Sequence, residues 1–280
     1  MAINWFPGHM AKTRREMKES MKLVDAVIEL RDARIVKASA NPDIDDICGN
    51  KPRIVLLNKC DLSEEKITNQ WIKELTRENV RAIAVNSLTG EGLKSIKLML
   101  DDILKEKHDR LKAKGLAKIV DRVMVAGIPN VGKSSFINKM ARNNIAKTAD
   151  RPGVTKSKQW IKTSIGIELM DTPGILWPKF EDDEVALHLA FTGAIKDEIM
   201  DIEELALKLI EKLQILYPDR LMGRYKLDSL EEEPLANMDK IARKRGAVVS
   251  GGNIDYNRVA VLLLDEFRGG KLGSISLDRP

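Results

Sequence analysis

Three short motifs that are typical of nucleotide-binding domains occur in this chain in an unusual order. NKCD at residues 58–61 comes first, GIPNVGKS at 127–134 follows, and DTPG at 171–174 comes last. In a conventional domain with these motifs, NKxD comes after the other two. If all three contact one nucleotide, the chain folds as a circularly permuted form of that domain.

The second motif fits the pattern GxxxxGK[ST] and lies between an apolar run at 122–126 and a predicted helix at 134–142. In this context the backbone N–H groups of a glycine-rich loop bind phosphates at a helix N-terminus. Lys133 is then predicted to reach the β and γ phosphates, and the Ser134 hydroxyl to coordinate magnesium. The predicted phosphate-binding set is Asn130, Val131, Gly132, Lys133, Ser134, Ser135 and Gly174.

DTPG closes a predicted strand at 165–170 and supplies the second part of the phosphate site. We expect the Asp171 carboxylate to act in the magnesium shell, through water, and the Gly174 N–H to meet the γ-phosphate. Between the two motifs lies RPGVTKS at 151–157, in which Thr155 is the candidate for a switch residue that closes over magnesium.

NKCD begins at the last residue of the run at 53–58, directly after the apolar residues RIVLL, so its side chains should emerge at the carboxyl edge of a parallel sheet. Asp61 can accept from guanine N1–H and from the exocyclic amine, Lys59 can lay its stem along the ring, and Asn58 can tether neighbouring loops. Mispairing two buried groups with adenine costs about 1 to 3 kcal/mol each, which predicts a roughly 30-fold to 10⁴-fold preference for guanine. The full predicted guanine-binding set is Asn58, Lys59, Cys60, Asp61, Asn86 and Ser87.

Asn86 and Ser87 belong to this set because they lie at the end of the next predicted strand, at 81–86. GTP-binding domains place there a loop whose backbone N–H contacts guanine O6. An ordinary turn between a strand and a helix uses similar residues, so the sequence leaves both interpretations open.

The 280 residues are 43% apolar, enough for an α/β domain and a smaller appendage. Runs typical of strands and helices alternate through residues 1–178, beginning with a helix at 10–24 and including a basic connector at 105–122. Leucines at 205, 209, 213 and 216 then mark one helical face, and 259–267 marks another. We expect a permuted P-loop domain, with a mostly parallel sheet and helices on both faces, over 1–178, and a small all-helical domain over 179–280.

The net charge of +5 is unevenly distributed, since residues 1–178 hold 32 Lys and Arg against 22 Asp and Glu, whereas 179–280 hold 15 against 20. Basic residues concentrate in 1–22 and in 105–122, a distribution that suits nucleic-acid phosphates but also an ordinary solvated helix face. No apolar run approaches the ~20 residues of a membrane span, and the first residues lack the apolar stretch of a secretory signal. Cys48 and Cys60 have neither metal-site nor disulfide-framework spacing. We therefore expect a cytoplasmic protein that does not bind membranes.

With NWFPGHM at residues 4–10, the permuted order resembles the YlqF/YawG family of circularly permuted GTPases over essentially the whole chain. The resemblance implies a GTPase that acts late in assembly of the large ribosomal subunit, with a C-terminal helical domain that helps to bind ribosomal RNA. Ile175 and Leu176 stand where Ras-like GTPases carry the glutamine that orients water. The resemblance implies that His9 is the catalytic group instead, and that Asn130 ligates a potassium ion beside the phosphates. From the residues alone, His9 could equally cap the first helix or pack beside Trp5.

These observations favour a monomeric switch that binds GTP or GDP, magnesium and a ribosomal particle. One alternative is a GTP-dependent regulator whose helical domain docks a protein effector. Another is an enzyme that couples GTP hydrolysis to tRNA chemistry, although no cofactor site or reactive cysteine is evident for it.

Overall fold

The computed structural model describes residues 10–116, 119–141, 160–174, 176–177 and 182–280, and the statements below concern these residues. The chain divides into two compact units. Among the described residues, the first unit holds those between 10 and 177 together with 276–280, and the second holds 182–275.

A six-stranded sheet forms the centre of the first unit, with the strand order β3-β2-β1-β4-β6-β5. Every neighbouring pair is parallel except the hairpin of β5 and β6, which is antiparallel. The strands are β1 (Ala26–Asp32), β2 (Arg53–Asn58), β3 (Val80–Val85), β4 (Arg122–Gly127), β5 (Trp160–Lys162) and β6 (Glu168–Asp171). The predicted mostly parallel sheet is therefore confirmed.

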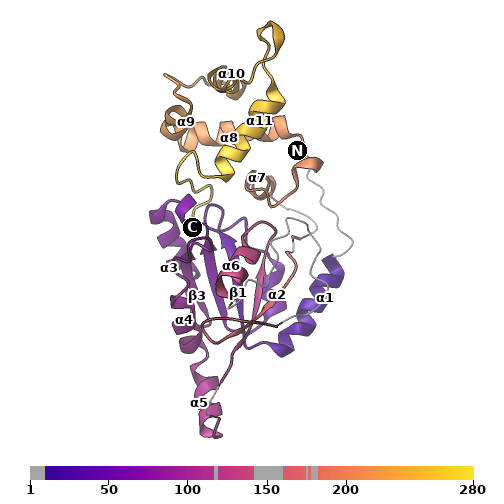
Figure 1. Ribbon diagram of the computed structural model, residues 1–280, viewed down its shortest axis with the longest axis vertical. Coiled ribbons are helices and arrows are strands. Elements are labelled where there is room, and N and C mark those ends of the chain that lie inside the picture. The colour runs from indigo at the N-terminus through magenta and orange to yellow at the C-terminus, as the bar shows by residue number, and fades with distance from the viewer. Residues whose placement is uncertain (1–9, 117–118, 142–159, 175, 178–181) are drawn as a thin grey trace. The chain divides into compact units, whose positions relative to one another are not determined.

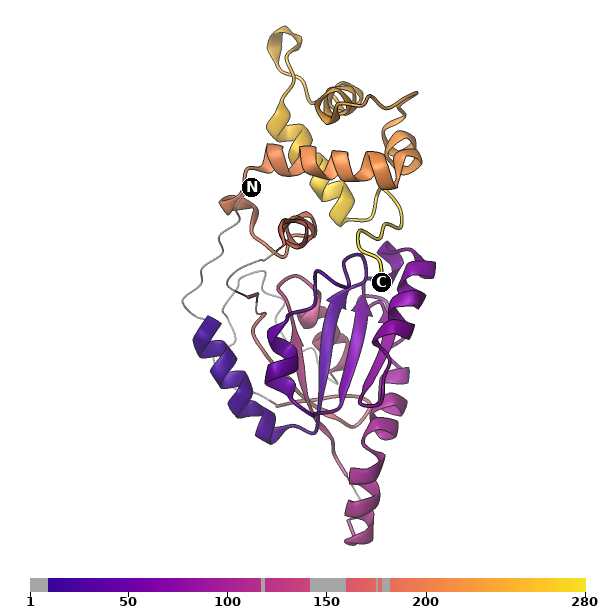
Figure 2. The same ribbon diagram turned by 180° about the vertical axis from the view of Figure 1, so that it is seen from behind.

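Helices cover both faces of this sheet, as predicted (Figures 1 and 2). Val27, Val55 and Met124 are buried on one face, in clusters that also contain residues of the helices on that side. These helices are α1 (Met10–Ser20), α2 (Asp43–Cys48) and α3 (Glu65–Leu75). The other face packs against α4 (Ser95–Ile103) and α6 (Lys133–Met140).

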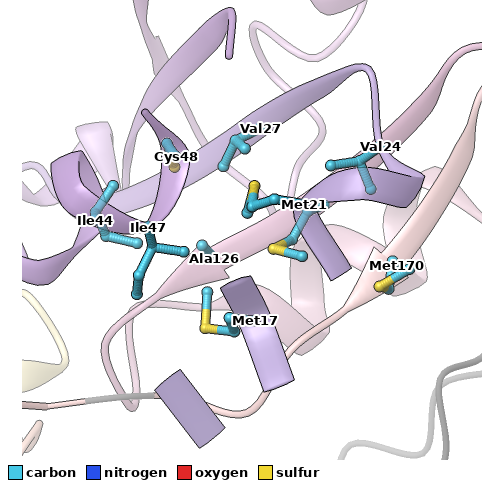
Figure 3. Packing of buried hydrophobic residues seen from close by; sticks show 10 residues of the cluster. Met17, Met21, Val24, Val27, Ile44, Ile47, Cys48, Ala126 and Met170 are labelled. Carbon is cyan, nitrogen blue, oxygen red and sulfur yellow. The ribbon is translucent and has the colours of Figure 1, made fainter. Parts of the chain in front are cut away.

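Apolar residues of α1 and of the turn that follows it form a compact cluster with α2 (Figure 3). Met17 and the following Met21 pack with Ile44, Ile47 and Met170, so the methionines belong to the core. Two of the basic residues on α1 also have internal partners, because Arg14 and Lys18 both contact the carboxylate of Asp46 on α2, at 2.8 and 2.7 Å. Part of the basic excess of the first 22 residues is therefore neutralised within the unit.

The basic connector is helical over much of its length. The structure ends α4 at Ile103 and starts α5 (Lys105–Ala113) after the buried Leu104. None of the residues of α5 is buried. This helix projects from the sheet in Figure 1, which explains why its sequence lacks an apolar stripe.

The second unit is helical, as the leucine spacing indicated. Its α-helices are α7 (Asp183–Phe191), α8 (Ile202–Leu216), α9 (Pro218–Tyr225), α10 (Pro234–Arg245) and α11 (Tyr256–Arg268). Helix α8 lies at the centre and contacts all four others, with Leu205, Leu209 and Leu213 fully buried. Asn237 of α10 is buried too, and its amide bonds the side chain of Gln214 and the backbone of Glu231.

Residues 276–280 return to the first unit, in which they lie against the loop that follows β1. The backbone N–H of Leu277 donates to the carbonyl oxygen of Arg34 at 2.8 Å, and the Asp278 carboxylate accepts from the N–H of Ala38 at 2.8 Å. Burial raises the pKa of Asp278 to about 6. Within the described parts of the chain, every helix is too short or too polar to cross a membrane.

Candidate nucleotide-binding site

The three sequence motifs meet at one edge of the sheet. Asn58 ends β2, Gly127 ends β4 and Asp171 ends β6, and these strands run in the same direction. The chain passes from β1 outward to β2 and β3, whereas β4 lies on the other side of β1. Ligands bind beyond the carboxyl ends of the strands at such a reversal of strand order.

Asn58 joins the first motif to the second. Its side chain is 2% exposed, and its amide nitrogen donates to the carbonyl oxygen of Val131 at 2.8 Å. Its amide oxygen accepts from the backbone N–H of Ser87 at 3.0 Å. One buried side chain therefore ties the NKCD segment to the phosphate loop and to the loop after β3.

Lys59 makes a second connection between the same segments. Its ammonium group donates to the carbonyl oxygen of Asn130 at 2.8 Å and lies 2.9 Å from the carboxylate of Asp32. Lys59 and Asn130 both have positive φ angles, 59° and 57°, which few residues other than glycine adopt. The two loops thus hold uncommon backbone conformations at the point where they touch.

The phosphate loop passes so close to the side chain of Asn58 that only glycine fits at position 132. Its φ is 98°, and a Cβ atom added there would lie 2.3 Å from the side-chain nitrogen of Asn58. Helix α6 begins at the next residue, Lys133, with Ser134 and Ser135 in its first turn. Backbone N–H groups without helical partners are available at such a terminus for an anion.

Lys133 and Asp171 form the charged part of the phosphate site. The Lys133 ammonium donates to the carbonyl oxygens of Gly127 and Ile128 at 3.0 and 2.8 Å. Burial lowers the pKa of Lys133 to about 8, and Asp171 offsets part of this effect. Burial likewise raises the pKa of Asp171, with Lys133 acting in the opposite direction. The lysine therefore lacks a close anionic partner among the described groups, a situation that phosphate would relieve.

The DTPG loop lies directly against the phosphate loop. The Thr172 hydroxyl is buried and donates to the carbonyl oxygen of Val125 on β4 at 2.7 Å. A Cβ atom added at Gly174 would lie 2.9 Å from the Lys133 ammonium nitrogen and 3.0 Å from the backbone nitrogen of Pro129. All three motifs therefore adjoin one another in space, as the permuted fold requires.

The loop after β3 is built by its own hydrogen bonds. The amide oxygen of Asn86 accepts from the N–H groups of Leu88 and Thr89 at 2.9 and 3.1 Å. The ammonium group of Lys139, on α6, donates to the Leu88 carbonyl at 3.1 Å. Asn86 therefore shapes the turn, Ser87 serves as the anchor for Asn58, and their contact with guanine stays a prediction.

The remaining predicted residues have mixed positions. Asp61 is exposed and lies with the half-buried Cys60 in a short 3₁₀ helix, Cys60–Leu62, directly after Lys59. Leu176 is 1% exposed, so its apolar side chain is part of the core. His9 and Thr155 lie outside the described residues.

Sequence reasoning missed Asp32 and Arg34. Asp32 ends β1 opposite Asn58, and it is 2% exposed, as is Arg34, which grips it through both carboxylate oxygens. The available signal was positional: an acidic residue ends a strand that lies beside the NKCD strand.

Comparison with known proteins gives a consistent set of relatives. The family model described as a 50S ribosome-binding GTPase matches residues 122–236. Ribosome biogenesis GTPase A of Bacillus cereus is 49% identical over 280 residues, which span 100% of this chain and 95% of that protein. Its namesake in Thermotoga maritima is 31% identical, over 99% and 95% of the two chains. The crystal structure of GNP-bound YlqF from T. maritima matches with a TM-score of 0.68 at 29% identity, covering 96% of this chain and 98% of that one.

Proposed function

Because this chain belongs to the ribosome biogenesis GTPase A family, we propose that it is a GTP-hydrolysing switch that binds the large ribosomal subunit during its assembly. In the GTP state it associates with the immature particle, and hydrolysis releases it. The order of motifs and the contacts of Asn58 and Lys59 support the nucleotide part of this proposal, whereas the ribosomal part rests on the relatives.

The observation that carries the proposal is the connection of NKCD to the phosphate loop. The hydrogen bonds from Asn58 to Val131 and from Lys59 to Asn130 bring a guanine-recognition motif beside a phosphate cradle. In this arrangement Asp61 selects the guanine base and Lys133 binds the β and γ phosphates of the same molecule. GTP is therefore preferred to ATP.

Magnesium is the metal that suits the oxygen groups beside the phosphate loop. The Ser134 hydroxyl lies in the first turn of α6 and the Asp171 carboxylate at the end of β6, and hydroxyl and carboxylate oxygens are ligands that this ion accepts. We assign Ser134 as a direct ligand, Asp171 as a ligand through water and Thr155 as the residue that completes the shell in the GTP state. Bound there with the nucleotide, the ion neutralises phosphate charge.

Hydrolysis needs a group that orients water, and Leu176 is buried and apolar. His9 is proposed for this task, since an imidazole both hydrogen-bonds water and accepts its proton. Asn130 is proposed to ligate a potassium ion that stabilises charge between the β and γ phosphates. Equal turnover in sodium and potassium buffers would remove the potassium assignment.

Two basic surfaces suit contact with ribosomal RNA. One consists of exposed residues on and directly after α5, and the other of exposed residues on α10 and α11. The first contains Lys105, Arg110, Lys112 and Lys114, and the second Arg243, Lys244 and Arg258. Lys107 is excluded from the first surface, because its ammonium group contacts Asp25 and Asp121 at 2.7 and 2.9 Å. Particle binding should weaken steeply as the salt concentration rises.

The decisive experiment measures GTP turnover with and without purified large subunits, for wild type and His9→Ala, with the protein acting as a monomer. We expect the particle to stimulate the wild type and to lose that effect in the variant. If the particle stimulates His9→Ala as strongly as the wild type, a group other than His9 orients the attacking water. Particle binding that ignores both nucleotide state and ionic strength would contradict the switch, and capture of a protein that survives nuclease treatment would favour an effector instead.

A further inference from the structure

We propose that Asp32, gripped by Arg34, is a positioning residue that holds the guanine-motif lysine, Lys59, in its binding geometry before nucleotide arrives. The inference rests on the proposed function, because it takes Lys59 as the residue that lies along the guanine ring. It adds to that function a residue outside all three nucleotide motifs.

The Asp32 carboxylate is enclosed by cationic and N–H donors. One oxygen accepts from the backbone N–H and Nε of Arg34 at 3.1 and 2.9 Å, and the other from Nη2 of Arg34 at 2.8 Å. The second oxygen also lies 2.9 Å from Nζ of Lys59. Burial alone would raise the pKa of Asp32, but the charges of Arg34 and Lys59 hold it well below its usual range. Asp32 is therefore ionised over the whole physiological range.

A buried ion pair of this kind is a poor means of stabilising a fold, because desolvation offsets most of the attraction. Arg34 already satisfies both oxygens of Asp32. Asp32 does not need Lys59 as a hydrogen-bond partner, so the main effect of their contact is to fix the position of the Lys59 ammonium group.

Lys59 has a flexible four-carbon stem, and fixing it costs conformational entropy. Asp32 on one side and the carbonyl oxygen of Asn130 on the other fix its ammonium group at the junction of two loops. Because this ordering precedes binding, the nucleotide does not have to impose it, and affinity rises.

The loop that carries Arg34 is itself braced from two directions. The Ser39 hydroxyl accepts from the N–H of Asp32 at 3.1 Å and donates to the carbonyl oxygen of Ile35 at 2.6 Å. The N–H of Leu277 donates to the Arg34 carbonyl at 2.8 Å. A rigid support of this kind is what a positioning residue needs.

The test compares Asp32→Asn with Glu29→Gln in the full-length protein. Glu29 is a matched control, because it is a carboxylate of the same strand, 1% exposed and paired with Arg31 and Arg53, but on the opposite face of the sheet. We expect Asp32→Asn to raise the KM for GTP and the Kd for a fluorescent GDP analogue about 10-fold to 100-fold, the loss associated with one charged hydrogen bond. Its kcat at saturating GTP should stay within about threefold, and Glu29→Gln should change neither constant by more than that.

A double-mutant cycle shows whether Asp32 acts through Lys59. Lys59→Met weakens binding, and adding Asp32→Asn to it should cost less than about threefold more. Equal losses in both backgrounds, or wild-type affinity in Asp32→Asn, would overturn the inference. If Lys59→Met binds weakly while Asp32→Asn binds normally, the inference fails and the nucleotide site stands. If the wild type binds no guanine nucleotide, the proposed function fails.

A measurement on the wild type does not depend on the folding of any Asp32 variant. The Lys59 ammonium protons, assigned by their absence in Lys59→Met, should exchange slowly in the NMR spectrum of nucleotide-free protein. If these protons become protected from exchange only after GDP is added, Lys59 is not ordered before nucleotide binds, and the inference is contradicted.

Discussion

Replacing Asn58 with alanine should weaken nucleotide binding as well as destabilise the fold. The change removes two hydrogen bonds, and leaves the carbonyl oxygen of Val131 and the N–H of Ser87 buried without these partners. Each group left unpaired costs about 1–3 kcal/mol, so the total is about 2–6 kcal/mol. The two loops that Asn58 joins then lose their fixed separation, and bound nucleotide must restore it. If restoring that separation costs the binding reaction only the lower bound, about 2 kcal/mol, GDP affinity falls about 30-fold.

The assay is the Kd of a fluorescent GDP analogue, measured beside thermal unfolding without nucleotide. Asn237→Ala is the matched control, because Asn237 is 0% exposed and makes three hydrogen bonds within the helical unit. Both variants should melt at lower temperature, and only Asn58→Ala should bind GDP weakly. The reasoning is refuted if Asn58→Ala binds within about threefold of wild type, or if Asn237→Ala loses affinity equally.

Three further outcomes follow from single contacts. Gly132→Ala should weaken GDP binding at least as much as Asn58→Ala, because its Cβ would lie 2.3 Å from the Asn58 amide nitrogen at a φ of 98°; normal affinity in equilibrium titration would contradict the packing. Burial lowers the pKa of Lys133 to about 8, and bound phosphate should raise it again, so GDP binding should take up about half a proton at pH 8 and about a tenth at pH 7. Calorimetry in buffers of different ionisation enthalpy measures this uptake. No uptake at pH 8 would refute the assignment of Lys133 as a phosphate-binding residue. Arg268→Met should destabilise the helical unit by about 1–3 kcal/mol, because Arg268 bonds the carbonyls of Ala190 and Phe191 and both oxygens of the partly exposed Asp197. Its GDP affinity should stay normal, and an unchanged melting temperature would be the opposing result.

The sheet and the positions of the motifs were predictable because their signals are local. The run 53–58 forms a strand with the same first and last residues as predicted, and the strand Arg122–Gly127 is one residue longer than the predicted 122–126. Apolar runs bounded by polar turns indicate buried parallel strands, and motif order indicates their connection. Asn58 makes two hydrogen bonds of the kind that its expected tethering role requires, and its place in the guanine-binding set stays a prediction.

Other features depend on partners that are distant in sequence. The strand predicted at 165–170 begins only at Glu168, because 163–167 form the turn of a hairpin with β5, in which Gly166 has a φ of 82°. The short helix α2 has only six residues and shows too little periodicity to be recognised. The return of 276–280 has no local signal either, since the buried Ser276 and Leu277 are explained only by their contacts with Glu64 and Arg34, which are distant in sequence.

The same distinction applies to the candidate site. The motifs name residues that face the nucleotide, whereas the supporting side chains carry no motif. Asp32 and Arg34 lie in a segment, 31–36, that reads as an ordinary strand end, and their importance follows from contact with Lys59. Asn86 illustrates the converse, because a residue selected for the base also builds its own loop.

The most direct test of the account is a crystal structure of the protein with a non-hydrolysable GTP analogue. It should contain one analogue molecule whose guanine lies within hydrogen-bond distance of the Asp61 carboxylate, and whose phosphates contact Lys133 and the N-terminus of α6. A base that lies away from Asp61 while the phosphates occupy the cradle, or two separate molecules at the two motifs, would contradict the claim that the rearranged segments form one site.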